Sequence, residues 1–470
     1  MATVENLQKY KDAGLNVLFT GYVFGFSKIN GDFENSSLKS VMDMAAQVGL
    51  KVIVLESSLH SLSSNESSLI VTDGSENGVN SFASQDALNA RVEYLVEDII
   101  AHEAFYGFVL KDEPKYTQFT AMGQVYKAIK AVAPSAYVNM NLLPYSPGLI
   151  DGNTDTEYYC ANEDDAYVSG ADVSATTAAK EACYKAYLQA FYEATGAKIV
   201  QYDDYPIKES GVNGDTGSPY ILSSHLSALK IVAEFCRDND LQFSKVLQSC
   251  AGMTKRSSDG QFVYAWKKPT ENDFYWQAYM ALAMGVEGYS YWSYYPVVNQ
   301  GSYESYDETA SFVDREGNVN ETTYYTLQTI HSFMQKYAKV LKNFEYQEMG
   351  AYYAFGSAYE GSKAFLSSVS GSLSDVQVTL KTSVASGSSD GAAVLATKLY
   401  DEENGQSGYW FVNAEDPVQA GVVEFDVTFG NEYGHIVVYN EGEYTIYELD
   451  ENGKASFSLE CGRGVFVLPY

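Results

Sequence analysis

The chain has 470 residues, with 61 acidic side chains (Asp and Glu) against 30 basic ones (Lys and Arg), and 46% of its residues are hydrophobic. That hydrophobic fraction is typical of a globular protein with a sizeable core, which excludes disorder as a global description. The net charge of −31 would repel polyanions, so nucleic acids and acidic membranes are poor candidate partners, and neutral or cationic substrates are favoured.

The cysteines and the absence of long apolar runs argue against further classes of protein. The 5 cysteines are odd in number and widely spaced, without a C-x-x-C pair, which argues against a disulfide scaffold or a zinc ribbon. No apolar run approaches the roughly 18 residues of a membrane helix, and the first residues lack a basic and then apolar leader. We therefore expect no membrane insertion and no signal peptide in this chain. A secreted or cell-surface protein whose export signal has been removed is the favoured location, and the cytoplasm is the alternative.

From residue 3 to about 344, short β-branched or aromatic runs alternate with segments of helical period, which indicates repeated βα units. The predicted strands are Leu15–Tyr22, Lys51–Glu56, Tyr106–Glu113, Ala136–Leu143, Lys198–Tyr205, Gln242–Ser249 and Glu287–Tyr294. The predicted helices between them are Ser37–Val48, Gln85–Ala101, Gln118–Ala131, Ala175–Thr195, Ile221–Asp238 and Glu271–Met284.

The helix predicted before the first of these strands decides between an open sheet and a barrel. It covers Glu5–Ala13 and ends at Gly14, a helix stop, so we expect an earlier strand that is missing from the chain or hidden in its first residues. Seven visible strands and one lost strand make eight. We predict the α/β fold class: a (β/α)8 TIM barrel over residues 1–344, entered after its first strand.

After a predicted helix at Thr322–Leu341 the pattern changes to short alternating runs. These runs include Val376–Lys381, Ala393–Tyr400, Gly408–Val412, Gly421–Val427, His435–Tyr439 and Gly464–Leu468, separated by Gly, Ser, Asn and Asp turns. Strands at this spacing predict an antiparallel β-sandwich domain over residues 345–470, in which Glu451-Asn452-Gly453 forms a hairpin turn.

Acidic residues stand at two of the predicted strand ends, which is where barrel enzymes carry their catalytic groups. With the missing strand counted as the first, strand 4 ends in Asp112-Glu113-Pro114 and strand 6 in Asp203-Asp204-Tyr205-Pro206. Glycosidic hydrolysis needs one carboxylic acid to protonate the leaving oxygen and a second carboxylate to attack the sugar or to activate water. The competing interpretation is that such acids cap helices or solvate a rim.

Strand alternation selects among these acids, since successive side chains face opposite ways. Lys111 shares a side with Glu113, and Gln201 shares one with Asp203. We therefore predict Glu113 and Asp203 as the catalytic pair. Asp204 remains an alternative second carboxylate, and Asp112 is expected to bind substrate.

Other polar and aromatic strand ends are expected to line the cavity. Sugar rings combine apolar faces with hydroxyl edges, so aromatic platforms mixed with amides suit them, although β-propensity and core packing also explain such rings. The further substrate-binding candidates are Glu56, Asn141, Tyr205, Gln248, Tyr291, Trp292 and Tyr294.

Competing chemistries lack their local signatures. No two of the 5 histidines are spaced as in a zinc protease helix, and the sequence contains no G-x-S-x-G, G-x-x-x-x-G-K-[ST] or strand-linked G-x-G-x-x-G motif. We therefore predict no metal site and no cofactor, and we expect histidines such as His225 and His331 to be core or helix-surface residues. The sequence does not indicate the oligomeric state.

Several stretches together resemble a known family. They are residues 106–114 (YGFVLKDEP), 202–206 (YDDYP), 277–292 (QAYMALAMGVEGYSYW), 314–324 (DREGNVNETTY) and 453–468 (GKASFSLECGRGVFVL). They are similar to bacterial clan A glycoside hydrolases, in particular to family 42 β-galactosidase-like barrels and to an Asp-Glu-Pro subgroup common in gut bacteria.

The resemblance implies roles for individual residues. In that clan the acid/base is the Glu of an Asn-Glu pair that ends strand 4, so Glu113 matches it by position, while Asp112 stands where the family has Asn. The clan's nucleophile is a Glu that ends strand 7, whereas this strand ends at Gln248 without an acid. We therefore predict a glycoside hydrolase of oligo- or polysaccharides whose mechanism is either retaining or inverting. The alternative is a noncatalytic carbohydrate-binding protein on the same scaffold.

Overall fold

The computed structural model divides the chain into two compact units, Met1–Asp203 and Asp204–Tyr470. The structure describes residues 2–21, 24–146, 177–208, 220–222, 224–255, 262–296, 304–306, 311–355, 366, 372–381, 391–417 and 421–470. The domain boundary that we predict at residues 344/345 lies inside the second unit and stays a prediction.

The first unit is a parallel sheet whose strands alternate with helices. Its sheet has the order β1-β2-β3-β4-β5, and every neighbouring pair is parallel. The strands are β1 (Val17–Phe19), β2 (Lys51–Val54), β3 (Phe105–Asp112), β4 (Tyr137–Leu142) and β5 (Ile199–Asp203). The helices are α1 (Val4–Asp12), α2 (Ser37–Val48), α3 (Ser57–Ser63), α4 (Gln85–Ile100), α5 (Phe119–Val132) and α7 (Thr177–Thr195).

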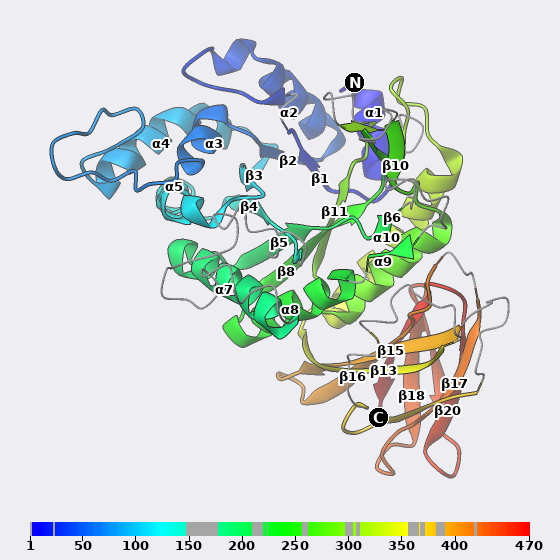
Figure 1. Cartoon of the computed structure of the whole chain (residues 1–470). Coiled ribbons are helices and arrows are strands. Elements are labelled where there is room, and N and C mark those ends of the chain that lie inside the picture. The colour runs from blue at the N-terminus through cyan, green and yellow to red at the C-terminus, as the bar shows by residue number, and fades with distance from the viewer. Residues whose placement is uncertain are drawn as a thin grey trace. The chain divides into compact units, whose positions relative to one another are not determined.

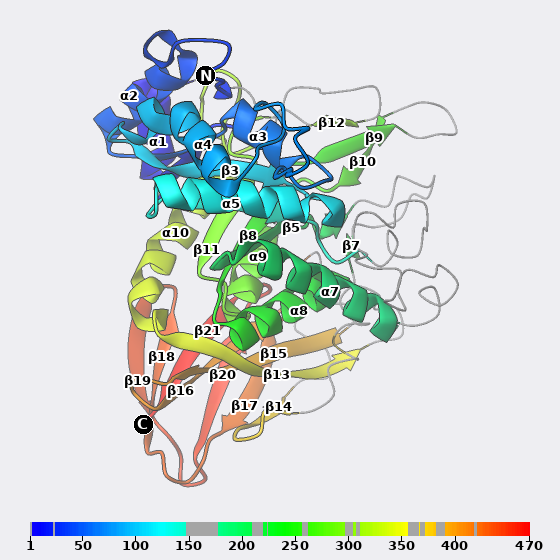
Figure 2. The same cartoon turned by 90° about the vertical axis from the view of Figure 1, so that its left-hand side faces the viewer.

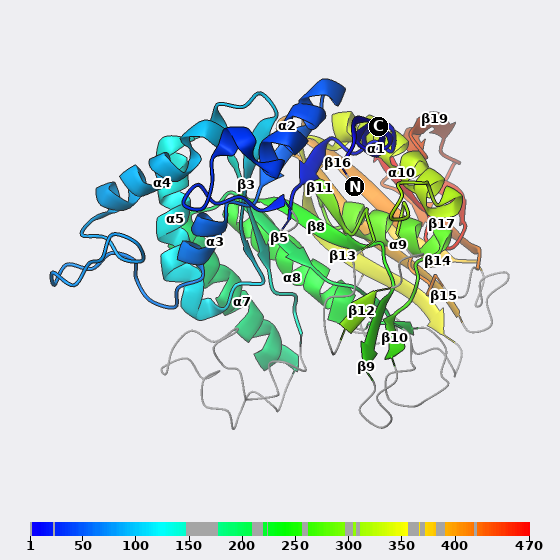
Figure 3. The same ribbon diagram turned by 90° about the horizontal axis from the view of Figure 1, so that it is seen from above.

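Local sequence signals explain where these helices begin and end. Ser36 caps α2 by accepting a hydrogen bond from the Lys39 N–H at 3.0 Å, and α2 ends at Gly49, whose φ of 72° is left-handed. Ser84 caps α4 in the same way. Helices α4 and α5 lie side by side over one face of β3 (Figures 1, 2 and 3), so one face of the sheet is covered by apolar helix surface.

The second unit continues the same alternation and then changes to antiparallel sheets. Strand β8 (Gln242–Gln248) pairs in parallel with β11 (Gly288–Trp292). The helices are α8 (Ser224–Asn239), α9 (Glu271–Ala283) and α10 (Glu321–Leu341). A five-stranded antiparallel sheet has the order β12-β9-β10-β6-β7. Its strands are β6 (Ile207–Lys208), β7 (Tyr220–Ile221), β9 (Gly252–Lys255), β10 (Phe262–Trp266) and β12 (Glu304–Tyr306).

The C-terminal part of the second unit consists of two further antiparallel sheets, drawn in yellow to red in Figure 1. Their orders are β13-β15-β16-β21-β18-β19 and β14-β17-β20. The strands are β13 (Phe344–Phe355), β14 (Gln377–Leu380), β15 (Gly391–Asp401), β16 (Gln406–Asn413), β17 (Val423–Thr428), β18 (His435–Asn440), β19 (Glu443–Glu448), β20 (Lys454–Leu459) and β21 (Gly464–Pro469). Val394 and Phe411 of one sheet and Phe425 and Val427 of the other share one buried cluster, as in a β-sandwich.

The predicted fold class is confirmed. Seven parallel strands with intervening helices occur among the described residues, and antiparallel sheets with a sandwich core follow them. The prediction of a hairpin at Glu451–Gly453 is wrong, although the turn itself is present. Strand β19 before the turn belongs to the six-stranded sheet and β20 after it to the three-stranded one, so the turn carries the chain from one layer to the other.

Candidate active site

A register shift at the end of β3 decides which way its polar side chains face. The pairing with β4 shifts between Val109 and Lys111, so Leu110 is an extra residue in the strand. Beyond the shift, Lys111 Nζ donates to Ser64 Oγ at 2.9 Å, at the end of α3. Asp112 Oδ1 instead accepts a 2.9 Å hydrogen bond from Asn141 Nδ2 on β4. The shift therefore places the Asp112 carboxylate beside Asn141.

Glu113 follows Asp112 where the strand ends. Its φ of 43° is left-handed, and its main-chain N–H donates to the Asn141 carbonyl at 2.8 Å. A left-handed residue breaks the strict alternation of a strand, so two successive carboxylates need not face opposite ways. The Glu113 side chain is exposed. The structure thus holds the backbone of Glu113 against β4 while its carboxylate faces solvent.

Polar side chains line one face of β3, β4 and β5 in the first unit. Asp112, Asn141 and Gln201 lie in register across the three strands, and Asp203 shares a side with Gln201 by alternation. The next register pair, Leu142 and Tyr202, is fully buried on the opposite face. We call the polar set, Asp112, Asn139, Asn141, Gln201 and Asp203, the polar strand face.

Most members of the polar strand face are buried. Asn139, Asn141, Gln201 and Asp203 are only 4–7% exposed. Asn139 Nδ2 and Asn141 Oδ1 have no hydrogen-bond partner among the described residues. Buried amide groups are normally paired, so buried amide atoms that have no partner among the described residues and lie beside carboxylates are typical of a binding surface.

Asp204, the first residue of the second unit, has a different environment. Its Oδ2 lies 2.6 Å from His225 Nδ1, and the Lys245 ammonium donates to its main-chain carbonyl at 3.4 Å. Burial raises the pKa of the Asp204 carboxyl, but the hydrogen bond and charge of His225 and the charge of Lys245 outweigh it, so the net pKa is lowered. The carboxylate is therefore held charged by a helix and a strand of its own unit.

Glu56 and Gln248 both have structural partners. Glu56 caps α3, where its Oε2 accepts from the Leu59 N–H at 2.7 Å, and burial raises its pKa. The Gln248 side chain exchanges two hydrogen bonds with the Ile207 main chain and donates a third to the Lys267 carbonyl at 2.9 Å. Their predicted contacts with substrate stay predictions.

The aromatic candidates divide by exposure. Trp292 is 38% exposed, and Tyr205 is half-buried with its ring 5.1 Å from that of Trp266. Tyr291 instead donates to or accepts from His331 Nε2 at 2.9 Å, and Tyr294, 6% exposed, packs on Phe312. Trp292 is therefore the exposed ring, Tyr205 and Tyr291 are half-buried, and Tyr294 is buried. The predicted contacts of these rings with a sugar stay predictions.

Sequence reasoning missed the partners of Asp204. His225 lies 21 residues further along the chain, and its role was not apparent from a single histidine on a helix. Lys245 carried a usable signal, because a lysine inside the apolar strand Gln242–Gln248 needs a buried partner. In the part of the chain that the structure describes, no cluster of His, Cys, Asp and Glu could hold a metal ion, and no helix there is long and apolar enough to cross a membrane.

No protein-family model and no curated protein sequence matches the chain. Solved structures do resemble it. A protein described as a glycoside hydrolase has 9% identity and a TM-score of 0.43, over 99% of this chain and 89% of that one. A glycoside hydrolase family 5 protein from Bacteroides vulgatus has 11% identity and a TM-score of 0.43, over 99% and 85%.

A third similar structure is a cycloisomaltooligosaccharide glucanotransferase from Paenibacillus in complex with cycloisomaltoheptaose. It has 11% identity and a TM-score of 0.45, over 99% of this chain and 82% of that one. Because the identities are this low, the chemistry has to be argued from the chain's own residues.

Proposed function

We propose that this chain is a glycoside hydrolase that uses carboxyl groups at the ends of β3 and β5. The observation that carries the proposal is the polar strand face, where Asp112, Asn141 and Gln201 lie in register on three neighbouring strands and Asp203 follows Gln201 on the same side of β5. Carboxylates and buried amide groups on one face match what bond cleavage and hydroxyl recognition require. The finer assignment to family 42-like barrels rests on the sequence motifs alone.

Within this proposal Glu113 is the general acid and Asp203 the general base. Glu113 gives its proton to the glycosidic oxygen as the bond to the anomeric carbon breaks. A water molecule adds to that carbon, and Asp203 takes the proton that the water loses. Asp204 is a poor candidate for this role, because its carboxylate is committed to His225 at 2.6 Å.

Strand spacing favours inversion of the anomeric centre. Neighbouring strands lie about 4.8 Å apart, so the backbones of β3 and β5, with β4 between them, are separated by roughly 10 Å. Carboxyl groups in inverting enzymes lie roughly 6.5–9.5 Å apart, against about 5–5.5 Å in retaining enzymes. Carboxyl groups carried on backbones roughly 10 Å apart leave room for the attacking water.

Two leaving groups separate the roles of the two carboxyls. We expect Glu113→Gln to slow hydrolysis of an alkyl glycoside by roughly 10²–10⁴-fold and that of an activated aryl glycoside much less, because only the poor leaving group needs the acid. Asp203→Asn should slow both. Asp43→Asn, at an acid 46% exposed on α2, is the control and should slow neither.

The outcome that contradicts the proposal is full activity of Glu113→Gln on both substrates. Product anomers read by NMR during the first turnovers test the stereochemistry, and a retained anomer contradicts inversion. Sugar binding by the unaltered protein without turnover of any glycoside in a broad panel would favour the noncatalytic carbohydrate-binding alternative.

A further inference from the structure

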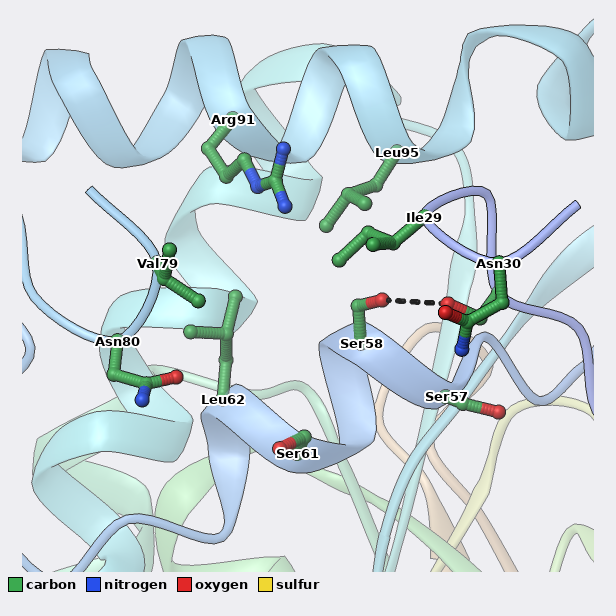
Figure 4. A pocket seen from close by; sticks show the side chains of 11 residues that line it. Ile29, Asn30, Ser57, Ser58, Ser61, Leu62, Val79, Asn80, Arg91 and Leu95 are labelled. Atoms are coloured by element: carbon green, nitrogen blue, oxygen red, sulfur yellow. Dashed lines mark hydrogen bonds between the residues drawn. The ribbon is translucent and has the colours of Figure 1, made fainter.

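A pocket lies between α3 and α4 in the first unit, apart from the polar strand face. Its volume is about 230 Å³, and its lining residues are hydroxyl, amide and apolar side chains with one arginine (Figure 4). They are Ser27, Ile29, Asn30, Ser57, Ser58, Ser61, Leu62, Val79, Asn80, Arg91 and Leu95. We call it the α3–α4 pocket. Pockets for drug-sized ligands are larger, about 300–1,000 Å³, so this volume suits a single small unit.

The walls of the α3–α4 pocket are fixed by local interactions. Lys28 forms ion pairs with Glu97 and Asp98 at 2.5 and 2.8 Å, which fasten the segment before Ile29 to α4. Ser27 Oγ and Ser58 Oγ lie 3.2 Å apart, within hydrogen-bond distance. These contacts define the shape of the pocket in the protein alone, so a ligand would not have to organise it.

Arg91 is the cation of the pocket, and its guanidinium extends from α4 into the space between the lining residues (Figure 4). Among the described residues Arg91 has neither an ion pair nor a hydrogen bond. It makes a cation–π contact with the Tyr94 ring, whose centroid lies 5.4 Å from the guanidinium carbon. Lys28, which also contacts Tyr94, is by contrast paired with two acids. In a chain with 61 acids and 30 bases, an arginine that lies beside a pocket and has no acid partner among the described residues needs an explanation.

None of the eleven lining residues is acidic, so the guanidinium is the only formal charge in the wall. Arginine binds carboxylates through two parallel hydrogen bonds, and its affinity for them is strongest where no other acid competes. The net charge of −31 repels anions at long range, but at physiological salt this field falls off over about 8 Å. Among the eleven lining residues Arg91 is the charged one, and the nearby acids Glu97 and Asp98 are paired with Lys28.

We propose that the α3–α4 pocket binds a carboxylate-bearing sugar unit of an acidic glycan. Arg91 would pair with the carboxylate, and Ser57, Ser61 and Asn80 would bind ring hydroxyls. The exposed side chains of Ile29 and Val79 would cover the apolar face of the ring. A simple inorganic anion would use the arginine but neither the amides nor these apolar side chains.

The position of the pocket links it to the proposed hydrolysis. Ser27 comes after β1 and Ser57 after β2, so both lie beyond the carboxyl ends of parallel strands, as Glu113 does after β3. In (β/α) barrels this edge carries the substrate site. The inference therefore rests on the proposed function and specifies its substrate as a glycan that contains uronic acid.

Direct binding tests the pocket without requiring turnover. We would titrate the unaltered protein, and the Glu113→Gln variant, with glucuronate, glucose and acetate by ligand-observed NMR. We expect glucuronate to bind at least tenfold more tightly than either glucose or acetate, and equally in both proteins. Because Glu113→Gln should bind glucuronate as tightly as the unaltered protein, the outcome of this binding test does not depend on whether Glu113 is the general acid.

Variants then locate the site. Arg91→Gln should weaken glucuronate binding by roughly ten- to hundredfold, the loss of one bidentate charged contact. Ser61→Phe, at an exposed position of α3, should block the pocket with Arg91 intact. Arg237→Gln is the matched control, because Arg237 already pairs with Asp238 at 2.7 Å.

Three results would overturn the proposal. They are unchanged glucuronate affinity in Arg91→Gln, glucose or acetate bound as tightly as glucuronate, and no binding of glucuronate at all. Far-ultraviolet circular dichroism would verify that each variant remains folded.

Discussion

The carboxylate of Asp204 and the imidazole of His225 lie 2.6 Å apart, and their side chains are only 7% and 2% exposed. The preceding residue, Asp203, ends β5 on the side of Gln201 and belongs to the polar strand face. Two consecutive acids therefore have different roles. Asp203 belongs to the proposed catalytic pair, and Asp204 ties the start of the second unit to α8.

We expect His225→Phe to destabilise the second unit by about 3–5 kcal/mol, because it leaves the buried Asp204 carboxylate without its partner. All 4 tryptophans, Trp266, Trp276, Trp292 and Trp410, lie in this unit. Denaturant unfolding followed by tryptophan fluorescence therefore measures its free energy of unfolding. His435→Phe is the control, since the exposed His435 ring stacks on Tyr470 and a Phe ring can do the same. A loss below about 1 kcal/mol in His225→Phe would contradict the buried pair.

The same carboxylate makes the second unit sensitive to acid. The pKa of Asp204 is lowered in the folded protein, since His225 and Lys245 outweigh burial, so the unfolded chain binds the proton more readily. The ionised Asp204 carboxylate therefore stabilises the second unit at pH values above 3.8, the ordinary pKa of an Asp. This stabilisation is lost as the pH falls through the lower pKa of Asp204 in the folded protein.

We therefore expect Asp204→Asn to unfold more easily than the unaltered protein at pH 7 and the difference to shrink below about pH 4. Tryptophan fluorescence in denaturant titrations at several pH values would measure it. Asp238→Asn, at an exposed acid on α8, is the control. A difference between Asp204→Asn and the unaltered protein that stays constant down to pH 2 would exclude this linkage.

Hydrophobic period and helix caps were enough to predict the (β/α) elements. The predicted helix Ser37–Val48 matches α2 from first to last residue, because Ser36 and Gly49 mark its ends. The short strands β6 and β7, two residues each, have too few side chains to show a period.

The site was harder to predict, because its geometry depends on a bulge and on long-range contacts. Alternation counted from Lys111 assigns it the side of Glu113, but the extra residue Leu110 sends Lys111 toward Ser64 and Asp112 toward Asn141. The α3–α4 pocket combines segments around Ile29 and Arg91 that are remote in sequence. No local sequence pattern predicts that these two segments lie side by side.

Asn141 links the candidate general acid to the polar strand face, since its Nδ2 holds Asp112 and its carbonyl holds the backbone of Glu113. We expect Asn141→Ala to lower kcat/KM for glycoside hydrolysis by roughly ten- to hundredfold, the loss of one hydrogen bond to a charged group.

The matched control is Asn343→Ala, because Asn343 also donates to a carboxylate, Glu403, at 2.7 Å, but at the exposed surface. Steady-state kinetics on one glycoside would compare the two variants. Equal activity of Asn141→Ala and Asn343→Ala would show that Asn141 does not position the site.

The last prediction concerns the buried carboxyl of Glu56, which is 0% exposed and has no lysine, arginine or histidine partner among the described residues. Burial raises its pKa, so the folded protein binds the proton more readily than the unfolded chain, and stability falls as the pH rises from the ordinary value of 4.5 through the folded pKa. We expect Glu56→Gln to keep the cap on Leu59 N–H and to stabilise the first unit at pH 7 by roughly 1–3 kcal/mol.

Because the first unit contains none of the 4 tryptophans, its unfolding has to be followed by circular dichroism and not by tryptophan fluorescence. The advantage of Glu56→Gln over the unaltered protein should vanish below pH 4.5, where the carboxyl is protonated in both states. Glu56→Ala, which removes the cap as well as the charge, should lie below Glu56→Gln by about 1 kcal/mol at every pH. If Glu56→Gln were instead less stable than the unaltered protein at pH 7, the Glu56 carboxylate would have to be charged and paired in the folded state, contrary to its raised pKa.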